Sequence, residues 1–209
     1  MIELIVPGIA GYLLGSVTLG MIVPRLMGTS KDVRKEGSGN VGATNVLRTQ
    51  GKLQGGLVLL GDLLKGSIAA GIGLAFAGIA GGAAAGIGAL IGHCYPLYFG
   101  FKGGRGVATG AGIVFVLFPK AVLLLLPVFV LTVLISRMVS LGSITAALAL
   151  LICLLVFQPP IPVMIFTFIA VPLIVGKHHS NIKRILAGTE NKFGKSRTAD
   201  EVDETEESQ

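Results

Sequence analysis

Long apolar runs separated by short polar segments make up most of this 209-residue chain. Each run is bounded by charged residues or helix breakers, a pattern typical of helices that cross a lipid bilayer. The pattern predicts seven such helices, over residues 3–24, 53–77, 82–99, 106–119, 121–136, 140–157 and 161–176. We therefore expect an all-α membrane protein with seven transmembrane helices.

The composition supports a membrane location. Hydrophobic residues make up 52% of the chain and charged residues only 13%, and the mean hydropathy is +0.81. A soluble domain carries far more charge. The span at 106–119 is nevertheless short, because a hydrocarbon core needs about 20 helical residues. We expect this segment to extend into neighbouring polar residues or to lie in locally thinned lipid.

The positive charges predict the orientation of the bundle. An odd number of spans places the two termini on opposite sides of the membrane. With the N-terminus outside, every Lys and Arg lies on the inner side except Lys65, within a span, and Lys120, outside. Cytoplasmic loops of membrane proteins carry such an excess of Lys and Arg. We therefore expect an external N-terminus and a cytoplasmic C-terminus.

The predicted domain organisation is simple. Residues 1–197 hold all seven predicted spans and the loops between them, so we expect them to form a single transmembrane domain. Residues 198–209 contain six acidic residues and no basic ones. This composition is typical of a solvated, disordered tail.

Three polar segments fall on the predicted inner side. They are KEGSGNVGATNVLR over 35–48, GHCYPLYFGFKGGRGVAT over 92–109 and KHHSNIKRILAGTENKFG over 177–194. We call them the first, second and third polar segments. A compact bundle brings loops on one side together, so we expect the three segments to share one site.

The first polar segment predicts an anion site. Residues 37–42 match the dinucleotide-binding pattern G-x-G-x-x-G, but that fingerprint follows a buried strand, whereas this stretch follows charged residues and precedes a span. Its glycines let consecutive backbone N–H groups turn toward one anion. The side chains available to donate hydrogen bonds are Ser38, Asn40, Thr44, Asn45 and Arg48. The alternative interpretation is a flexible connector.

The second polar segment places two cations and three glycines just before a span, as Lys102, Gly103, Gly104, Arg105 and Gly106. The helix that begins there points its free N–H groups and its positive dipole end toward the inner side, which favours an anion. Thr109 adds a hydroxyl in the first turn. The cations alone are explained as well by a basic cytoplasmic loop, but the interleaved glycines favour the anion site. His93 fits a structural or a functional role equally well.

The third polar segment contains His178 and Asn181, three residues apart on one helix face, where both can contact one ligand. Glu190 follows in the same segment. A single histidine at a membrane interface is usually structural, so this segment alone does not assign catalysis. Within the span at 53–77, Asp62 and Lys65 stand at i and i+3. Ionisable residues inside a membrane are functional candidates, but a structural ion pair beneath the site is the simpler interpretation.

Together these features describe an anion pocket beside apolar helices that can accept a lipid tail. Two cationic, glycine-rich clusters indicate two phosphate groups. An enzyme that joins a phosphate-bearing acyl donor to a phosphate-bearing acceptor fits this pattern. A transporter of organic phosphates or other anions is the alternative, and it fits less well because the chain shows no internal repeat.

Standard catalytic and metal-binding motifs are missing from the sequence. It contains no G-x-S-x-G, no Walker A and no set of His or Cys residues at metal-ligand spacing. No histidine is followed five residues later by Asp. We therefore expect no metal, no cofactor and no nucleic-acid partner. Acyl transfer on this chain would rely on orientation and charge stabilisation, by direct attack without an acyl-enzyme.

GSGNVGATNVLR, GHCYPLYFGFKGGRGVAT and HHSNIKRILAGTENKFG resemble, in order and spacing, the three inner-face motifs of the bacterial acyl-phosphate-dependent glycerol-3-phosphate acyltransferase family. The likeness extends to about Arg197. It implies a seven-span protein of the bacterial inner membrane with its active site on the cytoplasmic face. It also implies transfer of a fatty acyl chain from acyl phosphate to the 1-hydroxyl of glycerol 3-phosphate, giving lysophosphatidic acid and phosphate. A soluble enzyme that makes acyl phosphate is the implied supplier.

The resemblance also assigns roles by motif. The phosphate pocket would be lined by Ser38, Gly39, Asn40, Thr44 and Asn45, with Arg48 holding a substrate phosphate. The donor side would be completed by Lys102, Gly103, Gly104, Gly106 and Thr109. The acceptor would be oriented by His178 and Asn181. The implied catalytic residues are thus Ser38, Arg48, Arg105, His178 and Asn181, with His93, Asp62 and Glu190 as secondary candidates.

Two points stay open within this resemblance. The family usually has lysine where this chain has Arg105, which keeps the charge but replaces a compact ammonium by a planar fork. The general base is either His178 or the acceptor's own phosphate, whose second pKa is near 6 by analogy with phosphoserine.

Overall fold

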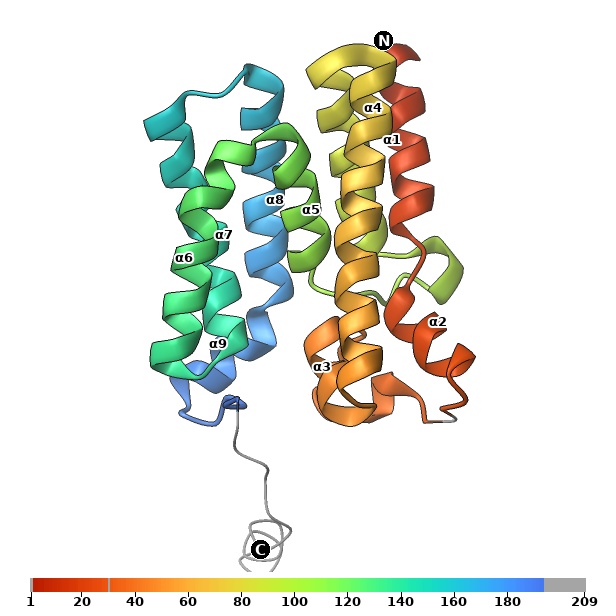
Figure 1. The fold of residues 1–209 in the computed structure, drawn as a ribbon, viewed down its shortest axis with the longest axis vertical. Coiled ribbons are helices and arrows are strands. Elements are labelled where there is room, and N and C mark those ends of the chain that lie inside the picture. The colour runs from red at the N-terminus through yellow and green to blue at the C-terminus, as the bar shows by residue number, and fades with distance from the viewer. Residues whose placement is uncertain (1, 30, 194–209) are drawn as a thin grey trace, which may run out of the picture.

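The computed structural model describes residues 2–29 and 31–193, which form helices and loops and contain no strand. The predicted acidic tail at 198–209, and the predicted end of the domain at 197, lie outside these residues. Figure 1 shows the helices as an upright bundle in which α5 stands between two groups, α1–α4 and α6–α9. The α-helices are α1 (Ile2–Gly15), α2 (Leu19–Leu26), α3 (Ala43–Thr49), α4 (Lys52–Cys94), α5 (Val107–Leu117), α6 (Pro119–Ser136), α7 (Val139–Phe157), α8 (Ile161–Lys177) and α9 (His179–Leu186).

The first predicted span, 3–24, is two helices rather than one. Helix α1 ends at Gly15 and α2 begins at Leu19. At the break, the Ser16 hydroxyl donates to the Tyr12 carbonyl and accepts from the Leu97 backbone N–H. The Val17 carbonyl accepts a hydrogen bond from Lys65 Nζ at 2.9 Å. These side-chain contacts replace helix backbone bonds, which the apolar pattern does not reveal.

Helix α4 contains a reversal that corresponds to the boundary between the predicted spans 53–77 and 82–99. Ala77 (φ −143°, ψ 34°) and Gly78 (φ 61°, ψ −158°) have non-helical backbone angles. Beyond them the chain turns back, and the backbones of Gly73 and Gly81 lie against each other. The second arm ends at Cys94, before the short 3-10 helix η2 (Leu97–Phe99).

Small residues allow α1 and the second arm of α4 to pack with their backbones in contact. A Cβ atom on Gly11 would collide with the carbonyl of Ala85, and one on Gly15 with that of Ala89. Close approach of this kind is how small residues at four-residue spacing join membrane helices. Gly11 and Gly15 therefore serve the packing of α1 against α4.

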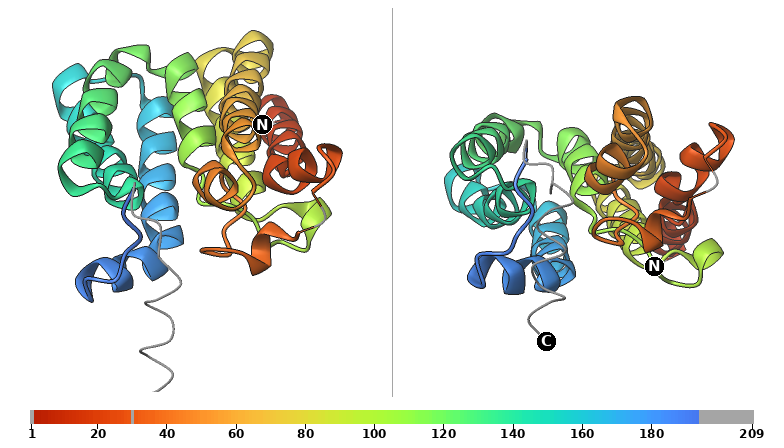
Figure 2. Two further views of the ribbon diagram at one scale, coloured as in Figure 1. Left: turned by 60° about the horizontal axis from the view of Figure 1, so that its bottom comes forward. Right: turned by 90° about the horizontal axis from the view of Figure 1, so that it is seen from below.

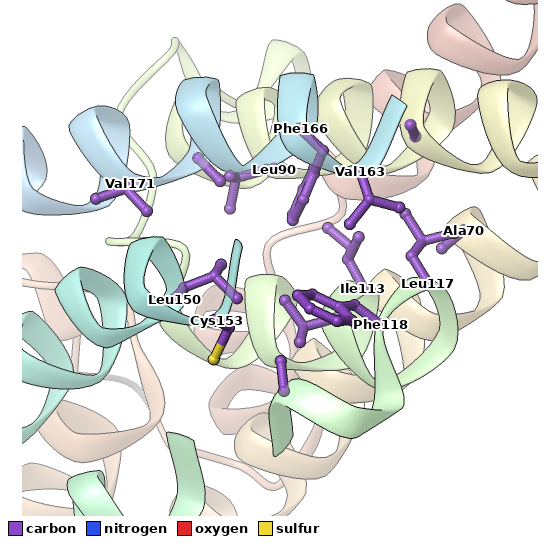
Figure 3. Packing of buried hydrophobic residues seen from close by; sticks show 14 of the residues in the cluster. Ala70, Leu90, Ile113, Leu117, Phe118, Leu150, Cys153, Val163, Phe166 and Val171 are labelled. Carbon is purple, nitrogen blue, oxygen red and sulfur yellow. The ribbon is translucent and has the colours of Figure 1, made fainter. Parts of the chain in front are cut away.

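The remaining spans agree closely with the sequence pattern. Helices α6, α7 and α8 begin and end within two residues of the predicted 121–136, 140–157 and 161–176. Helix α5 is shorter than the predicted 106–119. Figure 3 shows the apolar cluster that joins α5, α7 and α8 to α4, with Ile113, Phe166 and Leu150 near its centre.

Four stretches of the described chain are long and apolar enough to cross a membrane: Ile2–Leu26, Lys52–Phe99, Pro119–Ser136 and Val139–Phe157. Helices α8 and α9, bent by 55° at their junction, would add a fifth if they form one span. The all-helical, multi-pass character is therefore confirmed. The count of seven and the external N-terminus stay predictions.

The polar segments gather at one end of the bundle. Helices α3 and α9, with the loops that adjoin them, lie at the lower end of Figure 1, and the loop between α4 and α5 lies above them. We call this the polar end. Helices α3 and α9 belong to different groups of the bundle, as the two views in Figure 2 also show.

Candidate active site

A cavity of about 600 Å³ opens at the polar end and continues between the helices. Its walls come from the loop before α3 and from helices α3 to α9. The predicted site residues in its wall are Ser38, Asn40, Thr44, Asn45, Arg48, Asp62, His93, Arg105, Gly106, His178, Asn181 and Glu190. All three polar segments thus contribute to one site, although Ser38 and Glu190 are 152 positions apart in sequence.

The loop of the first polar segment is shaped by a buried asparagine. Asn45 Oδ1 accepts from the Ser38 backbone N–H at 2.9 Å, and its Nδ2 donates to the carbonyls of Val33 and Glu36. With its amide hydrogens used in this way, Asn45 holds the loop in place and is not free to donate to a phosphate. Ser38 and Thr44 remain in the cavity wall.

In the first segment, Gly39 shapes the loop and does not line the cavity. Gly39 has a positive φ of 69°, and its N–H donates to the Glu36 carbonyl at 3.0 Å. Gly39 is not part of the cavity wall. Its N–H therefore closes the loop, and the predicted contact of Gly39 with a phosphate is not what the structure favours.

Some residues of the second polar segment pack behind the site, and others line the cavity. Gly103 and Gly104 lie against His93, where a Cβ atom on either would collide with that residue. The Gly104 N–H donates to the His93 carbonyl at 3.1 Å. Lys102 is exposed and does not line the cavity. Of the predicted cluster of cations and glycines, only Arg105 and Gly106, directly before α5, line the cavity.

Thr109 is also outside the cavity wall. It is fully buried against α4, where Gly66 approaches its carbonyl so closely that a Cβ atom would collide. Within the described ranges its hydroxyl has no hydrogen-bond partner. The predicted hydroxyl contact from Thr109 to a donor phosphate is therefore not supported by its position.

Two guanidinium groups, Arg48 and Arg105, give the polar part of the cavity its positive charge. Neither forms an ion pair with an acidic side chain of residues 2–29 or 31–193. Burial lowers the pKa of Arg105 to about 10, with the positive charges of Arg184 and Arg48 adding to the effect and Glu190 opposing it. Arg105 thus stays charged at neutral pH, and uncompensated charge in a partly buried site favours an anionic ligand.

Beneath this charge lies a buried cluster of three ionisable residues from α4. Lys65 Nζ is 2.8 Å from Asp62 Oδ1, which confirms the predicted i, i+3 ion pair. His93 Nδ1 lies 3.6 Å from the same oxygen. Asp62 and His93 border the cavity, and His93 also touches the loop that carries Arg105. The cluster therefore supports the second polar segment from below.

Glu190 is the centre of a second polar cluster, on the opposite wall. Its Oε1 accepts from Ser140 Oγ at 2.8 Å and from Asn181 Nδ2 at 2.7 Å, and its Oε2 accepts from Arg184 Nε at 2.8 Å. Burial would raise the pKa of this carboxyl, but the hydrogen bonds from Asn181, Ser140 and Arg184 outweigh it and lower the pKa. Glu190 is therefore an ionised acceptor that ties α7 and α9 together.

His178 lies at the junction of α8 and α9 and is almost completely buried. Its Nδ1 is 2.7 Å from the Ile174 carbonyl. Burial is the main cause that lowers its pKa to about 4; the hydrogen bond to the Ile174 carbonyl and the charge of Glu190 oppose it, and the charge of Arg105 adds to it. His178 is thus a neutral imidazole at physiological pH.

The other part of the cavity is apolar. Its lining from α4 to α8 includes Leu63, Val114, Phe115, Val122, Leu125, Leu126, Phe129, Ala147, Leu150, Phe166, Ala170 and Ile174. Leu150 and Phe166, buried in the apolar cluster of Figure 3, form part of the inner wall. Leu59, Phe115 and Leu126 line the cavity yet expose 47%, 64% and 57% of their surface. The apolar part is therefore open along one side of the bundle.

Sequence reasoning missed Ser140, which lines the cavity and donates to Glu190. The available signal was a pair of serines, Ser140 and Ser143, one turn apart at the polar end of an otherwise apolar helix. Among the described residues no group of three or more His, Cys, Asp or Glu side chains is arranged to hold a metal ion.

Comparison with known proteins identifies the family of this chain. The family model described as glycerol-3-phosphate acyltransferase matches residues 5–188. A relative of that name from Syntrophotalea carbinolica is 49% identical over 88% of this chain and 95% of its own length. A relative from Aquifex aeolicus is 43% identical over 88% of this chain and 96% of its own.

Two solved structures share the fold. Both are of PlsY (YgiH), described as an integral membrane glycerol 3-phosphate acyltransferase. The glycerol 3-phosphate form is 42% identical with a TM-score of 0.87, and covers 91% of this chain and 96% of its own. The lysophosphatidic acid form is 41% identical with a TM-score of 0.84, and covers 91% and 95%. The chain therefore belongs to the glycerol-3-phosphate acyltransferase family of integral membrane enzymes.

Proposed function

We propose that this enzyme transfers a fatty acyl chain from acyl phosphate to the 1-hydroxyl of glycerol 3-phosphate, releasing lysophosphatidic acid and inorganic phosphate. The observation that carries the proposal is the single cavity that joins a cationic polar part to a long apolar part. The names of the two PlsY structures, in glycerol 3-phosphate and lysophosphatidic acid forms, support the acceptor and the product.

Each part of the cavity suits one part of the substrates. Arg48 and Arg105 face the same space, and two guanidinium groups can hold the phosphates of donor and acceptor side by side. The apolar part accepts the acyl chain. Burial of that chain places the acyl carbonyl at the boundary between the two parts, close to both phosphates, and such positioning accounts for much of the rate.

The reaction needs no covalent enzyme intermediate. The acceptor's 1-hydroxyl oxygen forms a bond to the acyl carbonyl carbon, and the bond from that carbon to the donor phosphate oxygen breaks. Phosphate leaves with the electron pair, stabilised by Arg48 and Arg105. The hydroxyl proton passes to a base.

The low pKa of His178 favours the acceptor's own phosphate as that base. An imidazole whose pKa is about 4 accepts a hydrogen bond well but holds a proton poorly at neutral pH. The phosphate, with a second pKa near 6 by analogy with phosphoserine, is better matched. His178→Gln distinguishes the two. We expect this variant to show a raised KM for glycerol 3-phosphate with much of kcat retained, whereas loss of kcat by several powers of ten would assign the base to His178.

Purified enzyme in lipid tests the reaction directly. It is incubated with glycerol 3-phosphate and either palmitoyl phosphate or palmitoyl-CoA, and lysophosphatidic acid and free phosphate are measured. We expect equal amounts of both products from acyl phosphate and none from acyl-CoA. Turnover with acyl-CoA alone, or no turnover with either donor, would contradict the proposal.

We propose further that the protein lies in the bacterial inner membrane with the polar end toward the cytoplasm. With the polar end on that side, a soluble enzyme of the cytoplasm can supply acyl phosphate to the site. Single cysteines introduced at exposed Thr189, at the polar end, and at Lys120, at the opposite end, test the orientation. A membrane-impermeant thiol reagent applied to intact cells should label position 120 and spare position 189, and the reverse result would overturn it.

A further inference from the structure

The apolar part of the cavity ends at a matching position on three helices. The residues that line it there are Val114 on α5, Leu150 on α7 and Phe166 on α8. We call these three the closed end, and each is at most 5% exposed. The residues one turn farther from the polar end are buried outside the cavity wall, as Leu117, Leu154 and Val163. They belong to the apolar cluster of Figure 3, which therefore closes the cavity.

The closed end lies at a defined depth. At a rise of about 1.5 Å per residue, Phe166 lies about 18 Å along α8 from His178, and Leu150 lies about 15 Å along α7 from Ser140. His178 and Ser140 belong to the polar part of the cavity wall. An extended alkyl chain advances about 1.3 Å per carbon, for bonds of about 1.5 Å. The apolar part is therefore about 12 to 14 carbons deep.

Small residues line the wall between the polar part and the closed end. They are Gly110 and Ala111 on α5, Ala146 and Ala147 on α7, and Ala170 on α8. Ala147 precedes Leu150 by one turn and lies nearer the polar end. A large side chain at this position would therefore close the cavity about 4.5 Å earlier, which is roughly three or four carbons of an alkyl chain.

An acyl chain that leaves the polar part can turn toward the open side or toward the closed end. At the open side, beside Phe115 and Leu126, a methylene group meets lipid as it does in the bilayer, and it gains nothing. The closed end differs, because a buried apolar cavity stays dry and its wall atoms lack contacts until an apolar ligand supplies them. The last carbons of the chain therefore gain most by lying against the closed end.

Building on the proposed function, we propose that Val114, Leu150 and Phe166 are specificity-determining residues that limit the acyl chain of the donor to about 16 carbons. The methyl end of the chain contacts these three side chains. A shorter chain leaves part of the cavity empty and loses contacts, whereas a longer chain must displace packed core residues. The preference therefore rises with chain length up to this limit and falls steeply beyond it.

Competition among three donors tests the limit in wild-type enzyme. Mixed micelles contain equal mole fractions of dodecanoyl, palmitoyl and eicosanoyl phosphate, with chains of 12, 16 and 20 carbons, and glycerol 3-phosphate is the acceptor. The lysophosphatidic acids formed are separated by mass, and their initial ratios give the ratios of kcat/KM. Relative to the palmitoyl donor, we expect kcat/KM to be lower by about 3- to 10-fold for dodecanoyl and by about 10- to 100-fold for eicosanoyl phosphate.

Variants on α7 move the limit in opposite directions. Leu150→Ala deepens the cavity and should raise the ratio of eicosanoyl to palmitoyl product at least about fivefold. Ala147→Phe shortens the cavity and should lower the ratio of palmitoyl to dodecanoyl product at least about tenfold. The matched controls are Leu148→Ala and Leu148→Phe, at a residue that is 47% exposed and outside the cavity wall, and both should keep the wild-type ratios. Ratios measured within one sample are insensitive to partial loss of folded protein.

The two levels of inference fail separately. If wild-type enzyme forms no lysophosphatidic acid from any of the three donors, the proposed function fails. If it is active but its kcat/KM is equal for the three chains or still rises at 20 carbons, or if Leu150→Ala and Ala147→Phe keep the wild-type ratios, only the limit set by the closed end fails. Should Leu150→Ala not fold, as judged by size-exclusion chromatography in detergent, Phe166→Leu takes its place, and the wild-type profile decides if neither folds.

Discussion

Asp62 and Glu190 are both buried carboxylates that border the cavity, but they are satisfied in different ways. Glu190 accepts three hydrogen bonds of 2.7–2.8 Å, from residues on α7 and α9. Asp62 has one close partner, Lys65 at 2.8 Å on the same helix, and His93 at the longer distance of 3.6 Å. The Glu190 cluster joins separate helices, whereas the Asp62 cluster lies within the two arms of α4.

The two carboxylates therefore support different parts of the site. The wall formed by α7 and α9 must hold the direction of individual polar groups, and a fully hydrogen-bonded carboxylate does this. The opposite wall must hold a backbone loop, which His93 does by contact with Gly103 and Gly104. Asp62 and Lys65 neutralise each other under that loop. We therefore expect substitutions at Asp62 to act mainly on stability and those at Glu190 to act on stability and substrate binding together.

Replacement of Asp62 should have the largest effect on folding. Asp62→Asn leaves the Lys65 ammonium buried without a counter-charge, and we expect a loss of about 3 to 5 kcal/mol in the free energy of unfolding. Thermal and denaturant unfolding in detergent measure it. The double variant Asp62→Leu/Lys65→Met removes both charges and should recover most of the loss. If the double variant is no more stable than Asp62→Asn, the ion pair is not the source of the effect.

Glu190→Gln should have the next largest effect. It keeps an acceptor for Ser140 and Asn181 but places a donor against Arg184 Nε, and we expect a loss of about 2 to 3 kcal/mol in unfolding free energy. Unlike Asp62→Asn, it should also raise the KM for glycerol 3-phosphate, because Glu190 holds Asn181 in the cavity wall. Equal KM values of the two variants for glycerol 3-phosphate, at matched folded fractions, would remove the distinction between the walls.

Acid should destabilise the Glu190 wall in a defined range. The pKa of His178 in the folded protein, about 4, is below its ordinary value of 6.5, so between these values the unfolded chain binds more protons. Stability from the neutral His178 is complete above pH 6.5 and is lost as the pH falls toward 4, by on the order of 3 kcal/mol. The lowered pKa of Glu190 adds a loss at still lower pH. His178→Gln should flatten the range from pH 6.5 to 4, and an unchanged slope would contradict this assignment.

Arg105 lies between the two clusters and should respond least to a conservative change. Arg105→Lys keeps the charge but loses the planar fork, so we expect a change of about 3- to 10-fold in the KM of one phosphate substrate with kcat retained. Initial rates with each substrate varied in turn show which phosphate it holds. A loss of kcat with both KM values unchanged would instead place Arg105 at the charge that develops during reaction.

Most of the fold could be predicted from the apolar pattern because spans are set by length and hydropathy. The boundaries of α6, α7 and α8 follow directly from it. The break between α1 and α2 could not, because its polar groups are satisfied by Leu97 and Lys65, which are distant in sequence. Hydropathy does not record such long-range hydrogen bonds.

The site was predictable at the level of segments and less so at the level of atoms. All three polar segments reach one cavity, as the prediction that they share one side of the membrane indicated. Asn45, Gly104 and Thr109 have the residue types that bind phosphate. Asn45 instead hydrogen-bonds to the loop, Gly104 packs against His93, and Thr109 is buried against α4. Ser140 was missed because a serine in an apolar helix often bonds only to its own backbone, as Ser143 does to the Val139 carbonyl. Residue type shows which hydrogen bonds a side chain can form, and only the packed structure shows with which partner it forms them.

The open side of the apolar part, bordered by Leu59, Phe115 and Leu126, has a consequence for enzymology. The proposed acyl phosphate donor would reach this opening by diffusing in two dimensions, so the concentration that governs its capture would be its mole fraction in the surrounding lipid or detergent. Adding empty micelles at constant bulk donor therefore dilutes the substrate at the surface and slows the enzyme, without any inhibitor having bound.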